Sequence, residues 1–139
     1  MNTKPVALIA VIVLLMVAAP TWAHHSFAAE FDAHAPVLLK GKVVKVQWIN
    51  PHAWIHIEVE KPEGNEIWMI EGGTPNTLFR RGVTRDTLAI GTEIVVRGYQ
   101  VKSGANAANG REITFPDGRK LFVGTKGTGA PDDGADPDK

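Results

Sequence analysis

The apolar and polar positions of the chain follow a period of two over most of residues 37–123. Residues 53–60 alternate strictly, with Ile55, Ile57 and Val59 on one face and polar or aromatic side chains on the other. This alternation is typical of a β-strand with one buried face. Comparable patterns predict strands over residues 37–48, 66–71 and 93–101, and a last hairpin or bent strand over 111–115 and 120–123.

The first predicted strand changes its apolar phase along its length. Leu39 and Val43 fall on one parity, whereas Val44 and Val46 fall on the other, and the change lies near Gly41. A phase change beside a glycine predicts a β-bulge in a coiled strand.

A short helix is predicted between the third and fourth strands. Thr74 suits the N-cap, Pro75 suits the first helical position, and Gly82 suits the C-terminal stop. The helix has about two turns, which we expect to carry Leu78 and Phe79 toward the core. Residues 61–65 and 102–110 are rich in turn-forming residues and are predicted as hairpin loops.

This order of elements predicts an all-β, mainly antiparallel fold. Three strands, a short helix and two more strands are the order of a small OB-like β-barrel, and another small, partly open barrel or sandwich is the alternative. Residues 24–123 form the predicted single domain. Within it, residues 24–36 are an N-terminal arm whose Phe27 and Phe31 hold it to the barrel. Residues 124–139, with glycine, proline and aspartate and little to bury, are predicted as a disordered tail.

Residues 1–23 have the pattern of a secretory signal peptide. Lys4 precedes an apolar run from Val6 to Ala19, and small residues stand at positions suited to cleavage after Ala23. The run is too short to cross about 30 Å of hydrocarbon comfortably. We therefore expect a periplasmic or secreted protein without a stable membrane span after cleavage, and His24 as its new N-terminus.

Charge and cysteine content exclude several classes of protein. The full chain has 15 basic and 15 acidic residues, and removal of residues 1–23 takes away only Lys4. A nearly neutral chain gives no electrostatic reason to bind nucleic acid. Because the chain has no cysteine, disulfides and thiolate metal sites are excluded.

The strongest candidate for a binding site is the corner at residues 48–56. It contains two of the four tryptophans and two of the five histidines around an Asn-Pro turn signal. The candidate ligand-binding residues are Trp48, Asn50, Trp54 and Glu71, because aromatic walls and a few polar groups are typical of barrel-mouth sites. The alternative is that these tryptophans are ordinary packing residues.

The candidate metal ligands are His24, His25, His52 and His56. Imidazole suits copper, zinc and nickel, and cleavage before His24 would add a free α-amine that chelates copper together with that imidazole. On one extended strand, residues 52 and 56 lie about 13 Å apart, so they are not expected to bind one ion together. The alternative is a solvated terminus and a His52 that caps the turn and packs on Trp48.

An enzyme is the least supported class. The chain has no His-Glu-x-x-His motif and no serine in a strand–turn–helix elbow. The sequence therefore predicts a binding or accessory module, with copper or another transition metal as its ligand. The alternative is a metal-independent module whose tryptophan-lined surface binds a protein, peptide or small molecule. An envelope protein is the candidate partner.

Three motifs carry a resemblance to a known family. They are His24-His25-Ser26-Phe27, Trp48-x-Asn50-Pro51-His52-Ala53-Trp54 and Gly72-x-x-Pro75-x-x-Leu78. Together they resemble a family of small secreted bacterial proteins of unknown function, over nearly the whole chain from His24 to about Val123. The resemblance implies a single-domain periplasmic β-barrel and supplies no catalytic residues.

Overall fold

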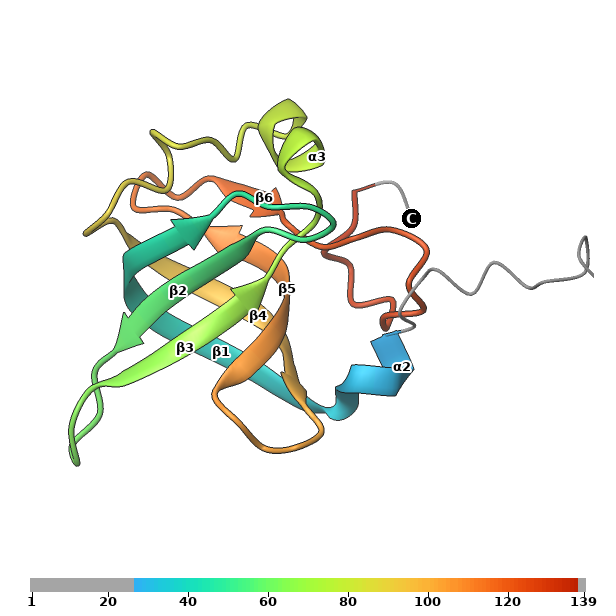
Figure 1. Ribbon diagram of the computed structural model, residues 1–139, viewed down its shortest axis with the longest axis horizontal. Helices are drawn as coiled ribbons and strands as arrows, with labels where there is room; N and C mark the ends of the chain where they lie inside the picture. The colour runs from blue at the N-terminus through green and yellow to red at the C-terminus, as the bar shows by residue number, and fades with distance from the viewer. Residues whose placement is uncertain (1–26, 138–139) are drawn as a thin grey trace, which may run out of the picture.

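The computed structural model describes residues 27–137, whose six strands form a mainly antiparallel β-structure (Figure 1). The prediction of an all-β, mainly antiparallel fold is thereby confirmed, as is that of a short helix between the third and fourth strands. The elements in chain order are α2 (Phe27–Glu30), β1 (Phe31–Gln47), β2 (Trp54–Val59), β3 (Glu66–Glu71), α3 (Pro75–Arg80), β4 (Glu93–Val101), β5 (Ala107–Thr114) and β6 (Lys120–Phe122). The predicted signal peptide, His24 and His25 lie outside the described residues.

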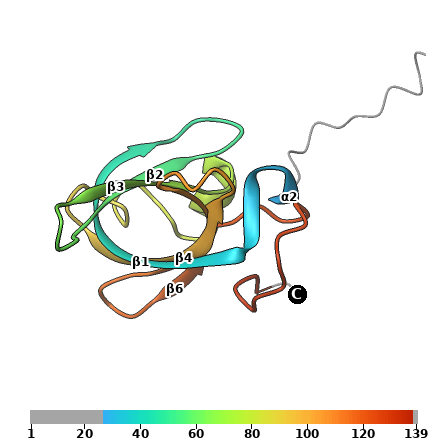
Figure 2. The same ribbon diagram turned by 90° about the horizontal axis from the view of Figure 1, so that it is seen from below.

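The strands close into a ring, which Figure 2 shows from below. Neighbours pair antiparallel in the order β3-β2-β1-β4-β5-β6, and a parallel pairing of β3 with β5 closes the ring. The prediction of a loop over residues 102–110 is wrong at its end, because residues 107–110 belong to β5 and residues 107–109 form this pairing. A Cβ at Gly110 would lie only 2.7 Å from Ile70 Cγ2, so glycine permits the close approach although it disfavours strands.

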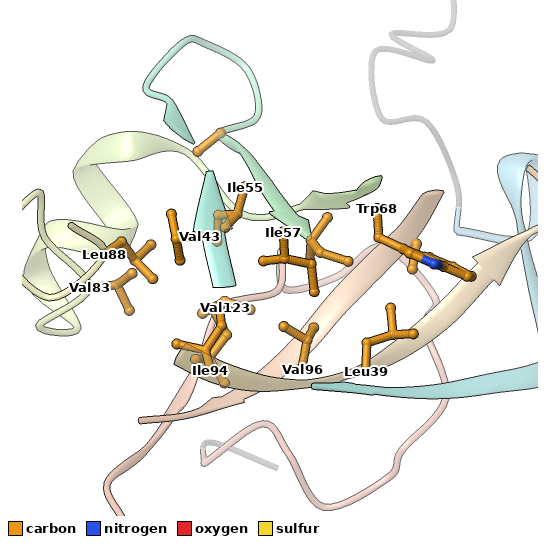
Figure 3. Close-up of a cluster of buried hydrophobic side chains, with 14 of the residues drawn as sticks. Leu39, Val43, Ile55, Ile57, Trp68, Val83, Leu88, Ile94, Val96 and Val123 are labelled. Atoms are coloured by element: carbon orange, nitrogen blue, oxygen red, sulfur yellow. The ribbon is translucent and has the colours of Figure 1, made fainter. Parts of the chain in front are cut away.

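Alternating apolar residues of the strands fill the interior of the ring (Figure 3). Ile55, Ile57 and Val59 are buried, as their pattern predicts, and Trp68 of β3 lies with them in the core. The bulge occurs between Val43 and Lys45, slightly beyond the predicted position. The outward-facing residues of β2 are therefore the polar and aromatic ones between these isoleucines.

Helix α3 and the segment after it cover one end of the ring (Figure 1). Thr74 Oγ1 accepts a hydrogen bond from Thr77 N–H at 3.2 Å, which confirms the predicted N-cap. Leu78 is fully buried, but Phe79 is 37% exposed, so the expectation that both point toward the core is wrong for Phe79. Consecutive helical residues point in directions about 100° apart, and a helix this short buries one stripe only.

Helix α2 and the segment after β6 lie together beside the barrel (Figure 1). Phe27 and Phe31 are buried with Tyr99 and Ala130 in a small second cluster, so both phenylalanines hold the arm in place. Strand β1 begins at Phe31, so residues 31–36 of the predicted arm belong to this strand, which is longer than predicted.

The segment 124–137, predicted as a disordered tail, lies against β4 and β5. Asp133 contacts Arg111 of β5 at 3.3 Å, and its backbone carbonyl accepts a hydrogen bond from Arg97 at 3.1 Å. Composition misses this arrangement because hydrogen bonds and ion pairs to Arg97 and Arg111 help to attach the segment. Among the described residues, no helix has the length and apolar character needed to cross a bilayer.

Candidate functional site

The corner between β1 and β2 is attached to the glycines that follow β3. Ala53 N–H donates to the Gly73 carbonyl at 3.0 Å, and Gly72 N–H donates to the Ala53 carbonyl at 2.8 Å. The corner itself contains a cis peptide bond between Asn50 and Pro51. These backbone hydrogen bonds place the residue before Ala53 beside the end of β3.

His52 and Glu71 form a partly buried pair at this corner. Nδ1 of His52 lies 3.2 Å from Glu71 Oε1, 3.1 Å from the Gly72 carbonyl oxygen and 3.5 Å from Thr125 Oγ1. Glu71 is buried, and a buried carboxylate requires a partner of this kind. The structure therefore brings together two of the candidate residues that the sequence places about twenty positions apart.

The contacts of Nδ1 determine which nitrogen of His52 carries the proton. A carbonyl oxygen only accepts hydrogen bonds, and an ionised carboxylate does the same. Nδ1 must therefore carry the hydrogen that it shares with Gly72 and Glu71, which leaves Nε2 with its lone pair in the neutral ring. An imidazole held this way can accept a proton or bind a metal ion through Nε2.

A cleft of about 250 Å³ lies next to this pair. Its lining includes Gly73, which bonds to the corner, and Thr125, which contacts His52. Arg81 and Lys126 also line the cleft, and Lys126 forms an ion pair with Asp136 at 3.8 Å. Figure 1 shows the connection from β1 to β2 reaching the start of the C-terminal segment, where Thr125 lies.

The tryptophans of the corner lie in two different environments. Trp48 is half-buried and packs on Phe79 of α3 with ring centroids 4.9 Å apart, and the Arg85 guanidinium lies over the Trp48 ring at 5.5 Å from its centroid. Ile49 beside it is 50% exposed, and Asn50 is exposed at the turn. Trp54 lies on β2 and pairs across the strands with Gln47 and Glu71.

His56 lies further along β2 and has different partners from His52. Its Nε2 lies 2.9 Å from Gln47 Oε1. Burial, followed by the positive charge of Lys45, lowers the pKa of His56 below its usual value. Within residues 27–137, no group of three or more histidine, cysteine, aspartate or glutamate side chains is arranged to hold a metal ion.

Two contributors to the corner have no signal in the sequence. Thr125 belongs to the segment predicted as disordered, and the Gly72 carbonyl is a backbone group. Glu71 has a signal, because it ends a strand directly before two glycines. Glu71 and His52 would have been identified as partners only if the pairing between the end of β3 and the corner had been predicted.

The fold and the corner define a small β-barrel protein with a partly buried histidine–carboxylate pair. The chain belongs to the family of unknown function DUF6152, which matches residues 11–110. The resemblance to a family of unknown function is thereby confirmed, whereas the secreted location of the protein stays a prediction. No curated protein and no solved structure matches the chain.

Proposed function

We propose that this protein is a secreted or periplasmic metal-binding module, rather than an enzyme, and that it binds copper. The observation that carries the proposal is the position of His52 Nδ1 between the Glu71 carboxylate and the Gly72 carbonyl. Metal-binding histidines in proteins usually donate their second ring N–H to a carboxylate or carbonyl, which fixes the tautomer and raises the basicity of the ligating nitrogen. His52 has both partners, and its Nε2 is the proposed ligand.

The mature N-terminus is proposed to supply the other ligands. Phe27 N–H donates to the Thr128 carbonyl at 2.8 Å, and residues 125–128 form a turn whose first residue contacts His52. Phe27 is therefore held one turn away from the histidine. Three residues span up to roughly 10 Å, and the proposal requires this length to carry His24 from Phe27 to His52 after a cut behind Ala23. The α-amine and imidazole of His24, with His25 as an alternative ligand, would then complete a three-nitrogen copper site.

The barrel is proposed to be of the OB type. Its ring runs β1-β2-β3-β5-β4 and returns to β1, with β3 and β5 parallel and α3 between the third and fourth strands. This order supports the assignment made from the sequence pattern. In such a barrel the corner at His52 lies at one end of the ring, where loops from several strands meet.

Copper titration of the mature chain tests the proposal. Intact mass first establishes whether the secreted protein begins at His24. The chain that begins there should bind one equivalent of Cu(II), and His52→Ala or one extra glycine before His24 should weaken binding at least tenfold. Glu71→Gln should weaken binding by about 10–100-fold, because it disturbs the residue that orients the ligand. His34→Ala is the matched control, since His34 is exposed on β1. Equal affinity of all these variants would exclude the site.

A second candidate function uses the aromatic surface at the same corner. Trp48, Ile49 and Phe79 present stacked and partly exposed apolar side chains, and exposed apolar patches often bind peptides or other proteins. Under this alternative, a double change of Ile49→Ser and Phe79→Ser abolishes capture of an envelope protein from a periplasmic extract, and copper has no effect on that capture. Capture that depends on copper, or that survives the double change, would contradict the alternative.

A further inference from the structure

A second pair of metal-ligand side chains lies on the outer face of β2 and β3, away from His52. His56 of β2 is the direct cross-strand partner of Met69 of β3. Their strand neighbours Ile55, Ile57 and Ile70 are fully buried in the barrel, so His56 and Met69 both face outward. Directly opposite residues of antiparallel strands have Cβ atoms about 4.5–5.5 Å apart. The imidazole and the thioether are therefore close enough to share one small ion.

The hydrogen bond of His56 leaves one nitrogen available. The Gln47 side-chain oxygen, 2.9 Å from Nε2, accepts hydrogen bonds and does not donate them. Nε2 therefore carries the ring hydrogen, and Nδ1 has the lone pair. Gln47 lies on β1 and Met69 on β3, on opposite sides of β2, so the orienting group and the second ligand do not compete for the same position.

An aromatic ring flanks the pair. Trp54 faces outward two residues before His56 and is a diagonal neighbour of Met69, within reach of a large side chain. The face of an indole ring attracts cations. Lys45, the β1 partner of His56, adds a positive charge nearby, but its side chain is exposed, so its ammonium group remains in solvent.

We propose that His56 and Met69 bind Cu(I), with the Trp54 ring against the bound ion. A thioether is a soft ligand that favours Cu(I) over magnesium or calcium. Cu(I) also accepts the low coordination number that two side chains provide. Met69 is 38% exposed, which leaves the sulfur accessible. The chain has no cysteine, and its other two methionines, Met1 and Met16, lie in the predicted signal peptide. Met69 is therefore the single soft sulfur of the predicted mature protein.

This single methionine makes the site directly testable. The mature protein, labelled with ¹³C at the methionine methyl group, should give one methyl signal by NMR. Ag(I), a stable substitute for Cu(I), should shift this signal, and the shift should be complete near one equivalent. A methyl signal that does not move during the titration would overturn the proposal.

Matched variants separate this site from the one at His52. In a competition assay with a Cu(I) chelator under reducing conditions, Met69→Leu and His56→Gln should each weaken binding at least tenfold. Leucine keeps the size and apolar character of methionine, and the partly exposed position tolerates it, so circular dichroism should be unchanged. Met69→Leu should leave Cu(II) binding unchanged, and His52→Ala should leave Cu(I) binding unchanged. Full Cu(I) affinity in Met69→Leu, or its loss in His52→Ala, would show that Cu(I) does not bind at this pair.

Discussion

Replacement of Asp133 by alanine removes the carboxylate that attaches the C-terminal segment to the barrel. Its partner Arg111 is almost fully buried, with 3% of its side chain exposed, and Asp133 itself is 13% exposed. Two of the Arg111 nitrogens lie 3.3 and 3.4 Å from the two carboxylate oxygens. The substitution therefore leaves a buried guanidinium without its counter-ion.

The expected loss of stability follows from what Arg111 retains. Removal of one partner from a buried ion pair costs about 3–5 kcal/mol when nothing replaces it. Arg111 keeps a hydrogen bond to the Pro131 carbonyl at 3.3 Å and lies 4.9 Å from the centre of the Phe122 ring, as long as the segment remains attached. We therefore expect Asp133→Ala to lower the free energy of unfolding by about 2–3 kcal/mol. For a domain of this size, the midpoint of thermal unfolding should fall by roughly 8–12 °C.

Urea and thermal denaturation, followed by tryptophan fluorescence, measure this effect. Asp132→Ala is the matched control, because Asp132 is exposed and its loss should change stability by no more than about 0.5 kcal/mol. If both variants unfolded with the same midpoint as the wild-type protein, the segment would not be attached through Asp133, and the reasoning would be refuted.

The pH dependence of the same variant supplies a second check. Burial raises the pKa of the Asp133 carboxyl group. The hydrogen bonds from Arg111 and from Ala135 N–H, together with the charges of Arg111 and Arg97, outweigh this effect. The pKa of Asp133 in the folded protein therefore lies below its usual value. The carboxylate thus stabilises the fold above its unfolded pKa of about 3.9, and this contribution disappears as the pH falls through the folded pKa. The difference between wild-type protein and Asp133→Ala should be constant from pH 5 to 8 and shrink below pH 4. A difference that shrinks near neutral pH would contradict this cause.

Three further predictions concern the barrel. Leu78→Ala should lower the free energy of unfolding by about 2–5 kcal/mol, because Leu78 is fully buried. Phe79→Ala should lower it by about 1 kcal/mol and mainly change the fluorescence of Trp48. Equal losses of the two variants in urea denaturation would contradict the orientation of α3. Gly110→Ala should destabilise by about 1–3 kcal/mol, since its Cβ would lie 3.0 Å from the Glu71 carbonyl oxygen, and an unchanged urea midpoint would argue against the parallel pairing. Because the pKa of His56 is lowered in the folded protein, its contribution to stability is present above about pH 6.5 and is lost as the pH falls through the folded-state pKa. His56→Gln should therefore flatten the pH dependence of the urea midpoint between pH 7 and 5. An unaltered pH dependence would show that His56 is not its cause.

Periodic patterns predict the strands with one buried face well, because apolar residues alternate with polar ones along such strands. The third and fourth strands have the predicted bounds, residues 66–71 and 93–101. The parallel pairing of residues 107–109 with β3 has no such apolar alternation, and the close approach of β3 beside it is permitted by Gly110. The pairing that closes the ring is therefore the part of the fold that the residue types do not predict.

The sequence identifies residues of the candidate site but does not show which of them contact each other. His52 and Glu71 have separate signals, and only the hydrogen bonds of Ala53 with Gly72 and Gly73 bring them together. Thr125 belongs to a segment that ion pairs and hydrogen bonds attach to the barrel, and composition does not predict these contacts. Cross-strand pairs such as His56 with Met69 likewise depend on register, which a single strand does not determine.

The proposed copper site is tested most directly by electron paramagnetic resonance of the mature protein with one equivalent of Cu(II). With ¹⁵N-labelled histidine as the nitrogen probe, the account predicts coupling of a single copper ion to the α-amine and imidazole of His24 and to the imidazole of His52. His52→Ala should remove one of the two imidazole couplings and retain the other. An identical spectrum for wild-type protein and His52→Ala would contradict the account, because His52 would then not be a ligand.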